Sequence, residues 1–521
     1  MSPPTSRQVS PVMLQLHLNG KPRQSPLCAQ LGAMLAQLPP AQMRSSVRGQ
    51  PRAPLCGMGV CQECRVQVNG QQALACQTLC APDQSINTRT ALLDSNAEPQ
   101  ALAEAQDCEL LIIGTGPAGL HAALAAAPSG MRITLLDDNP AAGGQIWRQG
   151  REVAPPLARL LDELGRHANV RWLQGLRVVG RAGAQALLVE GAEQGYVLHY
   201  QRLVLCTGAR ELLLPFPGWT LPGVTGAGAL QALIKGGLPV RGQRIVLAGS
   251  GPLLLAAAAT ARAAGARVQL IAEQAPWAAL REFGAGLWRH PAKAWQALRL
   301  LQSGYQADTL VREAHGTLQL EAVTVERQGR LEFMPCERLA CGFGLVPNVE
   351  LGQLLGCTLA EHGGLHTDAQ LQTSVPHIWA AGECTGHSGA ELAAAQGQLA
   401  GLSAAGVSQP QDQAARLQRR LQQGLAWSQR VREHFALSDA VRQLARSNTL
   451  LCRCEDVPLS AVLPFDDWIS AKLQTRCGMG ACQGRICGAA ARTLLGWQVP
   501  APRQLLGPVR LSTLASVPPQ E

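Results

Sequence analysis

The feature that most restricts the fold of this 521-residue chain is a glycine-rich turn that joins an apolar strand to a helix. Residues 109–113 predict a buried strand, and residues 120–127 predict a helix. Gly114, Gly116 and Gly119 lie between them. The first glycine permits a tight turn, the second lets the backbone approach a pyrophosphate, and the third lets helix and strand pack closely. The sequence therefore predicts a dinucleotide-binding turn.

An acidic residue supports this prediction. A second apolar strand, residues 132–136, ends at Asp137, which is 18 residues after Gly119. A carboxylate at this distance is expected to meet the ribose hydroxyls of an adenosine. Strand, glycines, helix, second strand and acid together favour a bound nucleotide over a glycine-rich turn that holds no ligand.

A second glycine turn follows later in the chain and departs from the pattern. Gly249 and Gly251 follow the strand 244–248, but Leu254 replaces the third glycine and Ala272 stands where the first unit has its acid. This turn is predicted to exchange hydride with NAD(P)H poorly. It is either a retained scaffold or a site for a nonreducing adenine nucleotide such as NAD or ATP.

The 17 cysteines suggest metal sites, because grouped thiols in an intracellular chain favour metal ligation over disulfides. Cys56, Cys61, Cys64 and Cys76 have the C-x4-C-x2-C…C spacing of plant-type [2Fe–2S] sites. A zinc site is the alternative, but it usually needs two short C-x2–4-C pairs and only one is present. Cys80 is a less favoured substitute for Cys76.

A second group lies near the C-terminal end, where five thiols compete for four ligand positions. They are Cys452, Cys454, Cys477, Cys482 and Cys487. The other eight cysteines are dispersed and are expected to pack as small apolar side chains. They are Cys28, Cys80, Cys108, Cys206, Cys336, Cys341, Cys357 and Cys384.

Charge and hydropathy exclude other classes. Lys and Arg number 45 against 36 Asp and Glu, but the basic residues are scattered and aromatics are only 4%. A nucleic-acid surface needs clustered charge and stacking rings, so no nucleic-acid partner is predicted. The longest apolar stretch is interrupted by Arg262 and is too short for a bilayer span. We expect a cytoplasmic chain without a transmembrane segment, held at most peripherally at the inner membrane through a complex.

Flanking regions differ from the centre. Residues 107 to about 400 alternate apolar strands with Ala-rich helices, which is typical of a parallel α/β sheet. The alternating run 12–18 followed by Asn19-Gly20 predicts a hairpin in a small β-rich module. Residues 81–106 have linker composition, and 408–447 have helical spacing.

Three further segments carry a family resemblance. Residues 139–145, 203–208 and 373–383 resemble the split FAD-binding domain of two-dinucleotide-domain flavoproteins, which include glutathione-reductase-like enzymes. The family usually has Asp where this chain has Glu383. The resemblance implies an FAD site formed by Gly114, Gly116, Gly119, Asp137, Gly143, Gly144, Gln145, Thr207, Gly208, Gly382 and Glu383.

The C-terminal cysteines resemble the bacterioferritin-associated-ferredoxin-like (BFD-like) domain of amine-oxidising flavoprotein subunits, in which C-x-C precedes G-M-G-x-C-Q-G-R-x-C. The resemblance implies that a second [2Fe–2S] cluster is held by Cys452, Cys454, Cys482 and Cys487. Cys477 remains a competing ligand, and zinc is harder to exclude here than at the first site.

The order of modules covers nearly the whole chain and resembles the flavoprotein (α-type) subunits of heteromeric dehydrogenases for opines, proline or hydroxyproline, and of hydrogen cyanide synthase. An α/β glutathione-reductase-like fold is implied, with a β-grasp-type ferredoxin domain before it and a small helical BFD-like domain after it. The implied domains are 10–90 (ferredoxin-like), 107–225 and 341–405 (the two halves of the FAD domain), 226–340 (inserted NAD-binding-like), 408–447 (helical connector) and 450–495 (BFD-like).

The resemblance also implies a function. A partner subunit with its own FAD, similar to amino-acid oxidases, would oxidise an amino acid or secondary amine, and this chain would pass the electrons to an acceptor such as a quinone. No catalytic residue is predicted, because cofactors would carry the chemistry. The alternatives are a self-contained NAD(P)H-dependent reductase that feeds its own clusters, and a noncatalytic iron–sulfur scaffold or redox sensor.

Overall fold

The computed structural model describes residues 13–26, 29–38, 42–88, 106–148, 150, 153–192, 194–289, 293–295, 299, 304–387 and 389–515. Cys28, both ends of the expected first domain and most of the expected linker lie outside these ranges. Within them, no helix has both the length and the apolar character needed to cross a bilayer.

The N-terminal module is a five-stranded sheet in the order β2-β1-β7-β5-β6. The predicted hairpin is confirmed, because β1 pairs antiparallel with β2 and the turn residues Asn19 and Gly20 have φ of 52° and 78°. Cys56, Cys61 and Cys64 lie between β4 and β5, and with Cys76 in η1 they form what we call the first thiol loop. The elements are β1 (Met13–Leu18), β2 (Lys21–Pro26), α1 (Leu31–Leu35), β3 (Arg44–Ser45), β4 (Pro51–Arg52), β5 (Arg65–Val68), β6 (Gln71–Leu74), η1 (Ala75–Gln77) and β7 (Ser85–Asn87).

The central seven-stranded sheet has the order β10-β9-β8-β13-β12-β11, and β24 also pairs with β13. Strands β8, β9, β10, β13 and β24 are parallel as expected, whereas β11, β12 and β13 form an antiparallel meander that the sequence pattern did not predict. Its strands are β8 (Gln106–Ile113), β9 (Ile133–Asp137), β10 (Val170–Gln174), β11 (Arg177–Gly183), β12 (Ala186–Glu190), β13 (Gly195–Leu205) and β24 (Ile378–Ala380).

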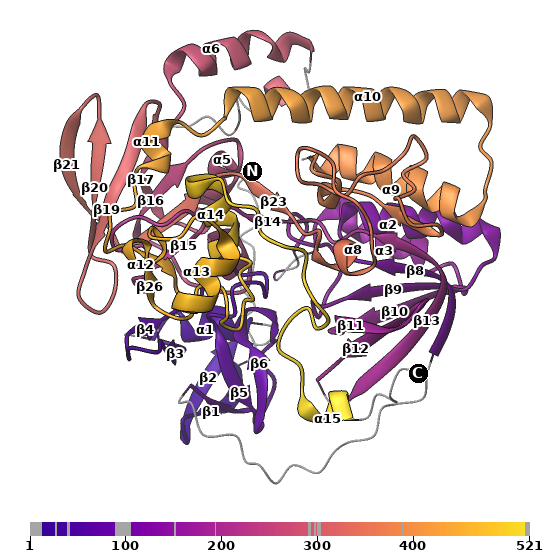
Figure 1. The fold of residues 1–521 in the computed structure, drawn as a ribbon, viewed down its shortest axis with the longest axis horizontal. Helices are drawn as coiled ribbons and strands as arrows, with labels where there is room; N and C mark the ends of the chain where they lie inside the picture. Colours follow the sequence, from indigo (N-terminus) through magenta and orange to yellow (C-terminus); the bar gives the residue numbers. More distant parts are fainter. Residues whose placement is uncertain are drawn as a thin grey trace, which may run out of the picture.

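Helices cover one face of this sheet, where Ala-rich surfaces let them approach closely (Figure 1). Pro117 begins α2, a position at which proline costs no helical hydrogen bond. The opposite face packs against the segment that contains α8. These elements are α2 (Pro117–Ala126), η2 (Ala127–Ser129), α3 (Pro155–Leu164), α8 (Glu350–Leu354), η4 (Glu383–Thr385) and α9 (Ala390–Ala405).

A second, parallel sheet with the order β15-β22-β16-β17-β18 carries the antiparallel sheet β19-β20-β21 beside it. The pair β14-β23 connects this part to the central sheet. The elements are β14 (Ala209–Glu211), β15 (Val224–Gly226), α4 (Ala227–Lys235), β16 (Arg244–Gly249), α5 (Leu253–Ala263), β17 (Arg267–Glu273), α6 (Trp277–Ala285), η3 (Leu287–Arg289), β18 (Tyr305–Gln306), β19 (Thr309–His315), β20 (Ala322–Arg327), β21 (Arg330–Pro335), β22 (Arg338–Gly342) and β23 (Leu345–Pro347).

The C-terminal region begins with the long helix α10, its short helices α12, α13 and α14 lie near the N-terminal module, and the last helix, α15, lies beside β12 (Figure 1). One hydrophobic core contains Cys56 and Cys61 together with Cys452 and Cys482, so both thiol groups share it. The elements are α10 (Gln411–His434), α11 (Asp439–Arg442), β25 (Leu450–Cys452), β26 (Val457–Pro458), α12 (Leu459–Val462), α13 (Trp468–Thr475), α14 (Cys487–Leu495) and α15 (Leu511–Ala515).

Candidate functional site

The first glycine turn is shaped by two tight contacts and one open position. A Cβ on Gly114 would lie 2.2 Å from the carbonyl oxygen of Cys206, and a Cβ on Gly119 would lie 1.8 Å from that of Gly114. At Gly116 the nearest atom to a Cβ is Gly144 Cα, 3.8 Å away. Two of the glycines are therefore required by packing, whereas Gly116 leaves space next to the start of α2, where helix amides favour a phosphate.

The Gly143-Gly144 turn lies against the first turn. The amide of Gly143 donates to the carbonyl of Thr115 at 2.8 Å, and a Cβ on Gly144 would lie 2.9 Å from Gly116 Cα. The side chain of Gln145 accepts a hydrogen bond from Arg148 at 3.1 Å. The structure thus places these predicted FAD residues beside the glycines of the first turn.

The predicted turn at Gly382 and Glu383 follows β24 and lies beside the first glycine turn. The amide of Ala381 donates to the carbonyl of Leu205, so β24 ends beside the end of β13. A Cβ on Gly382 would lie 2.9 Å from the Cβ of Ala118 at the start of α2. Glu383 follows directly, and burial raises its pKa. Gly382 and Glu383 are therefore next to the first turn although more than 250 residues separate them in sequence.

Thr207 and Gly208 follow β13 directly. The Thr207 hydroxyl donates to the carbonyl of Asn348 at 2.6 Å, and Asn348 Nδ2 donates back to the carbonyl of Thr207 at 2.9 Å. Gly208 has a φ of 66°, a left-handed conformation that favours glycine. This turn is fixed by Asn348, a residue that the sequence pattern did not single out.

Asp137 is hydrogen-bonded within the first turn. Its Oδ2 accepts from the amide and the hydroxyl of Thr115, both at 2.6 Å, and its Oδ1 accepts from the amide of Asn139 at 2.8 Å. Both carboxylate oxygens are thus occupied within the turn, where they fix the loop. The next residue, Asp138, is exposed and accepts from Asn139 Nδ2 at 2.9 Å. The Asp-Asp pair at the end of the strand was the sequence signal for this second carboxylate.

The first thiol loop buries all four predicted ligands. Cys56, Cys61, Cys64 and Cys76 are each at most 3% exposed. The amides of Met58 and Cys61 point at Cys56 Sγ, at 3.5 and 3.3 Å.

The thiols of this loop interact in two pairs. A hydrogen bond with Cys76, together with burial, raises the pKa of Cys64, and burial together with a hydrogen bond to Cys56 raises the pKa of Cys61. Two pairs of thiols suit a [2Fe–2S] cluster, in which each iron binds two of them. Cys80 instead accepts from the Ser25 hydroxyl at 3.5 Å, which disfavours it as a substitute for Cys76.

Arg148 connects the flavin turns to the first thiol loop. Its guanidinium donates to the carbonyls of Gly57 and Cys76 in the thiol region, the latter at 3.1 Å. It also donates to the side chains of Asn139 and Gln145, at 3.2 and 3.1 Å, on the flavin side. Sequence reasoning missed this residue, because its partners lie in two different modules.

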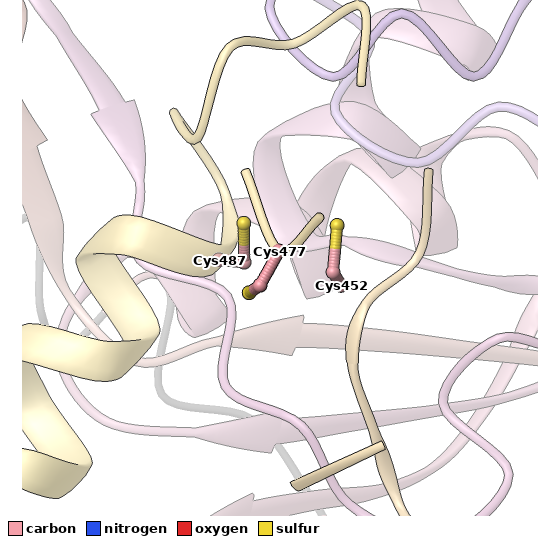
Figure 2. A group of neighbouring side chains, drawn as sticks. All are labelled: Cys452, Cys477 and Cys487. Carbon is pink, nitrogen blue, oxygen red and sulfur yellow. The ribbon is translucent and has the colours of Figure 1, made fainter. Parts of the chain in front are cut away.

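The second thiol group contains all five candidate cysteines, and each is buried. The sulfur atoms of Cys452, Cys477 and Cys487 lie within 4.8 Å of one another and come from three separate segments (Figure 2). The sulfurs of Cys454 and Cys482 are 3.6 Å apart. The pair of Cys454 and Cys482 resembles the two ligands of one iron in a two-iron site. The group of Cys452, Cys477 and Cys487 offers one thiol more than the other iron needs.

We expect a Cys477→Ser variant to retain the iron and sulfide of this site, whereas Cys482→Ser loses both. Cys477 is the extra thiol of the expected set, whereas Cys482 is paired with Cys454. Iron and acid-labile sulfide, measured on anaerobically purified protein, check this expectation. Loss of the cluster in Cys477→Ser with retention in Cys487→Ser would reassign the fourth ligand to Cys477.

At the second glycine turn, backbone and side-chain donors bond within the chain. The amide of Gly251 donates to Glu273 Oε2 at 2.8 Å, and Phe435 lies 3.9 Å from where a Cβ of Gly251 would be. The hydroxyl of Ser250 donates to the carbonyl of Phe435 at 3.0 Å. Burial raises the pKa of Glu273 to about 7. The amide of Gly251, which corresponds to Gly116, is thus already used within the turn, and the residues here fit a pyrophosphate less well than those of the first turn.

Comparisons with known proteins agree with this arrangement. Residues 108–399 match the family model of the pyridine nucleotide-disulphide oxidoreductases, and residues 12–91 match a 2Fe-2S iron-sulfur cluster binding domain. The chain is 31% identical to hydrogen cyanide synthase subunit HcnB of Pseudomonas protegens over 77% of this chain and 96% of that one. It is 32% identical to one of the subunits of opine oxidase from Rhizobium meliloti, over 74% of this chain and 92% of that one.

A similar fold occurs in a solved structure. The crystal structure of L-proline dehydrogenase from P. horikoshii matches with a TM-score of 0.68 and 18% identity, over 97% of this chain and 98% of that one. At this identity the match supports the fold alone. It confirms the predicted α/β class across nearly the full length.

Proposed function

Because this chain belongs to the pyridine nucleotide-disulphide oxidoreductase family and carries an N-terminal 2Fe-2S domain, we propose that it is the electron-transfer subunit of a heteromeric dehydrogenase. The chain is an FAD-dependent oxidoreductase. The substrate of the complex is an amino acid or secondary amine of the opine, proline, hydroxyproline or glycine class. A partner subunit similar to amino-acid oxidases removes the electrons from it, and a quinone is the proposed acceptor.

One observation carries the proposal: Arg148 contacts both the flavin turn and the first thiol loop. A flavin converts two-electron chemistry into one-electron transfer, which an iron–sulfur cluster accepts. In this chain Arg148 bonds to the loops of both the flavin site and the first cluster site. Its relatives along most of the length are named as subunits of hydrogen cyanide synthase and opine oxidase, which is why we assign substrate oxidation to a partner.

The proposed FAD site is the set predicted from sequence, with Asp138 and Arg148 added. The glycines of the first turn and the start of α2 bind the pyrophosphate, and Gly382 and Glu383 lie beside them. Asp138 meets the adenosine ribose, since both oxygens of Asp137 already accept hydrogen bonds within the turn. Arg148 fixes the adjoining loop.

The second [2Fe–2S] cluster is also part of the proposal. Cys452, Cys454, Cys482 and Cys487 hold it, and the buried pair of Cys454 and Cys482 supports this set. The sequence-derived domain boundaries are proposed as well. We propose no adenine nucleotide at the second glycine turn, where the amide of Gly251 already donates to Glu273.

The test uses the full chain purified anaerobically with its native partner. We expect one member of a panel of opines, proline, hydroxyproline and glycine to bleach the flavin and to support dye reduction by the complex. NADH should leave the flavin of the isolated chain oxidised, because the Gly251 amide of the second turn already donates to Glu273 and the Ser250 hydroxyl to Phe435. Dithionite, which reduces flavin without a nucleotide site, is the control.

Two outcomes would contradict the proposal. Rapid bleaching of the isolated chain by NADH would make it a self-contained reductase. A chain that holds intact clusters but never binds flavin would instead be a noncatalytic iron–sulfur protein.

A further inference from the structure

Five buried charged side chains lie between the two thiol groups, and we call them the junction charges. They are Arg44, Arg52, Glu63, Arg453 and Asp456, with relative exposures of 7%, 1%, 1%, 4% and 2%. Glu63 stands between Cys61 and Cys64, and Arg453 stands between Cys452 and Cys454. The junction charges therefore belong to the two thiol loops themselves and to the strands beside them.

Their contacts join the two loops directly. Arg44 Nη2 donates to Glu63 Oε1 at 2.7 Å, and Arg453 Nη2 lies 3.6 Å from Glu63 Oε2. Cys454 Sγ lies 3.9 Å from Glu63 Oε1, so a side chain of the first loop touches a predicted ligand of the second. Arg52 pairs with Asp456 in the same way, from the N-terminal module to the C-terminal one. Glu63 and Cys454 are 391 residues apart in sequence, and Arg52 and Asp456 are 404 residues apart.

The charges of this group do not balance. Three guanidinium groups face two carboxylates, which leaves one positive charge in a buried region. Among the described residues, the Nε atoms of Arg44, Arg52 and Arg453 and the Oε2 atom of Glu63 have no hydrogen-bond partner, although Arg52 Nε lies 3.9 Å from Glu63 Oε2. A buried, uncompensated charge with unused donors is costly unless an anionic group lies beside it. Clusters ligated by thiolates are anionic, and both thiol groups adjoin these arginines.

We propose that the junction charges hold the two iron–sulfur clusters side by side as one coupled pair and set the reduction potential of both. The inference rests on the second cluster of the proposed function. One electron passes from one cluster to the other, so that one is oxidised as the other is reduced, with no bond formed or broken. The chain therefore carries both clusters at a single position rather than at two ends of a path through the flavin.

Removing a negative or a positive junction charge should shift the reduction potentials of the clusters in opposite directions, and this gives a test. Glu63→Gln removes a negative charge between the clusters, so the more negative, reduced state is favoured and both midpoint potentials rise. Arg44→Gln removes a positive charge, so both potentials fall. The double variant restores the native net charge, and its potentials return toward those of the wild type. A structural defect alone would not give shifts of opposite sign that cancel.

The measurement is a redox titration followed by electron paramagnetic resonance on the full chain, with iron and sulfide counted in each variant. In the wild type, the fully reduced clusters are expected to show spin–spin interaction. Glu190→Gln is the matched control, because it removes a buried carboxylate whose partners, Arg177 and Arg510, belong to neither thiol loop. It should leave both potentials unchanged.

The results separate two kinds of failure. Two clusters without spin–spin interaction, or potentials that Glu63→Gln and Arg44→Gln leave unchanged or shift in the same direction, would overturn this inference alone. Iron and sulfide for a single cluster in the wild type would overturn it together with the two-cluster part of the proposed function.

Discussion

A Gly116→Val variant is expected to fold normally and to purify with less FAD per chain than the wild type. Gly116 has φ of −75° and ψ of −172°, which any residue adopts, and a Cβ there would meet only Gly144 Cα at 3.8 Å. The backbone therefore tolerates a side chain. The valine would instead occupy the space into which a pyrophosphate must come close to the backbone. We expect FAD affinity to fall by at least about tenfold, or about 1.4 kcal/mol.

FAD released by heat denaturation and counted per chain measures the effect, and circular dichroism verifies the fold. The variant should also unfold at a lower temperature, because it lacks the stabilisation by bound FAD. Gly284→Val is the matched control, since no atom lies within 4 Å of a Cβ at that glycine in α6. Full FAD occupancy in Gly116→Val would show that the cofactor does not approach this turn.

A Cys64→Ser variant is expected to lose the first cluster while it keeps the flavin and the second cluster. Cys64 interacts with Cys76 as one of the two thiol pairs of the loop, and a hydroxyl is a poor substitute for a thiolate ligand. Iron should fall from about four to about two atoms per chain, with an equal loss of sulfide. Electron transfer from the flavin to one-electron acceptors should fall with it.

Cys108→Ser is the control for this loss. Its thiol donates to the carbonyl of His199 at 3.2 Å, a bond that a serine hydroxyl also makes, and it belongs to neither thiol group. It should keep all the iron. Zinc in place of iron in the wild type, or unchanged iron in Cys64→Ser, would contradict the assignment of this loop.

Turns that depend on a few neighbouring residues are what the local sequence predicts well. The turn at Gly114 follows from sterics within a few residues, because an apolar strand, a positive φ and a helix start are all encoded nearby. The hairpin at Asn19 and Gly20 follows for the same reason. Clustering in the sequence also grouped the cysteines whose thiols lie near one another in each thiol group.

The sequence was less informative where chemistry depends on packing. Asp137 has the expected position, yet its oxygens are used within the turn, and this depends on the orientation of Thr115. At the second turn, Ser250 donates to the carbonyl of Phe435, which follows a 24-residue helix and has no motif of its own. Nor does spacing choose among five thiols, because Cys477 reaches the group through the fold of its loop.

The amino-acid sequence by itself determined the dinucleotide turn, the two sets of cysteines and the α/β class, since each depends on short-range backbone sterics and ligand spacing. Only the tertiary structure decided that the two thiol loops meet. Glu63 and Cys454 are 391 residues apart and touch because the first and last modules share one hydrophobic core. The hydrophobic effect that joins the modules is not directional, so no local sequence pattern predicts which surfaces will pack against each other.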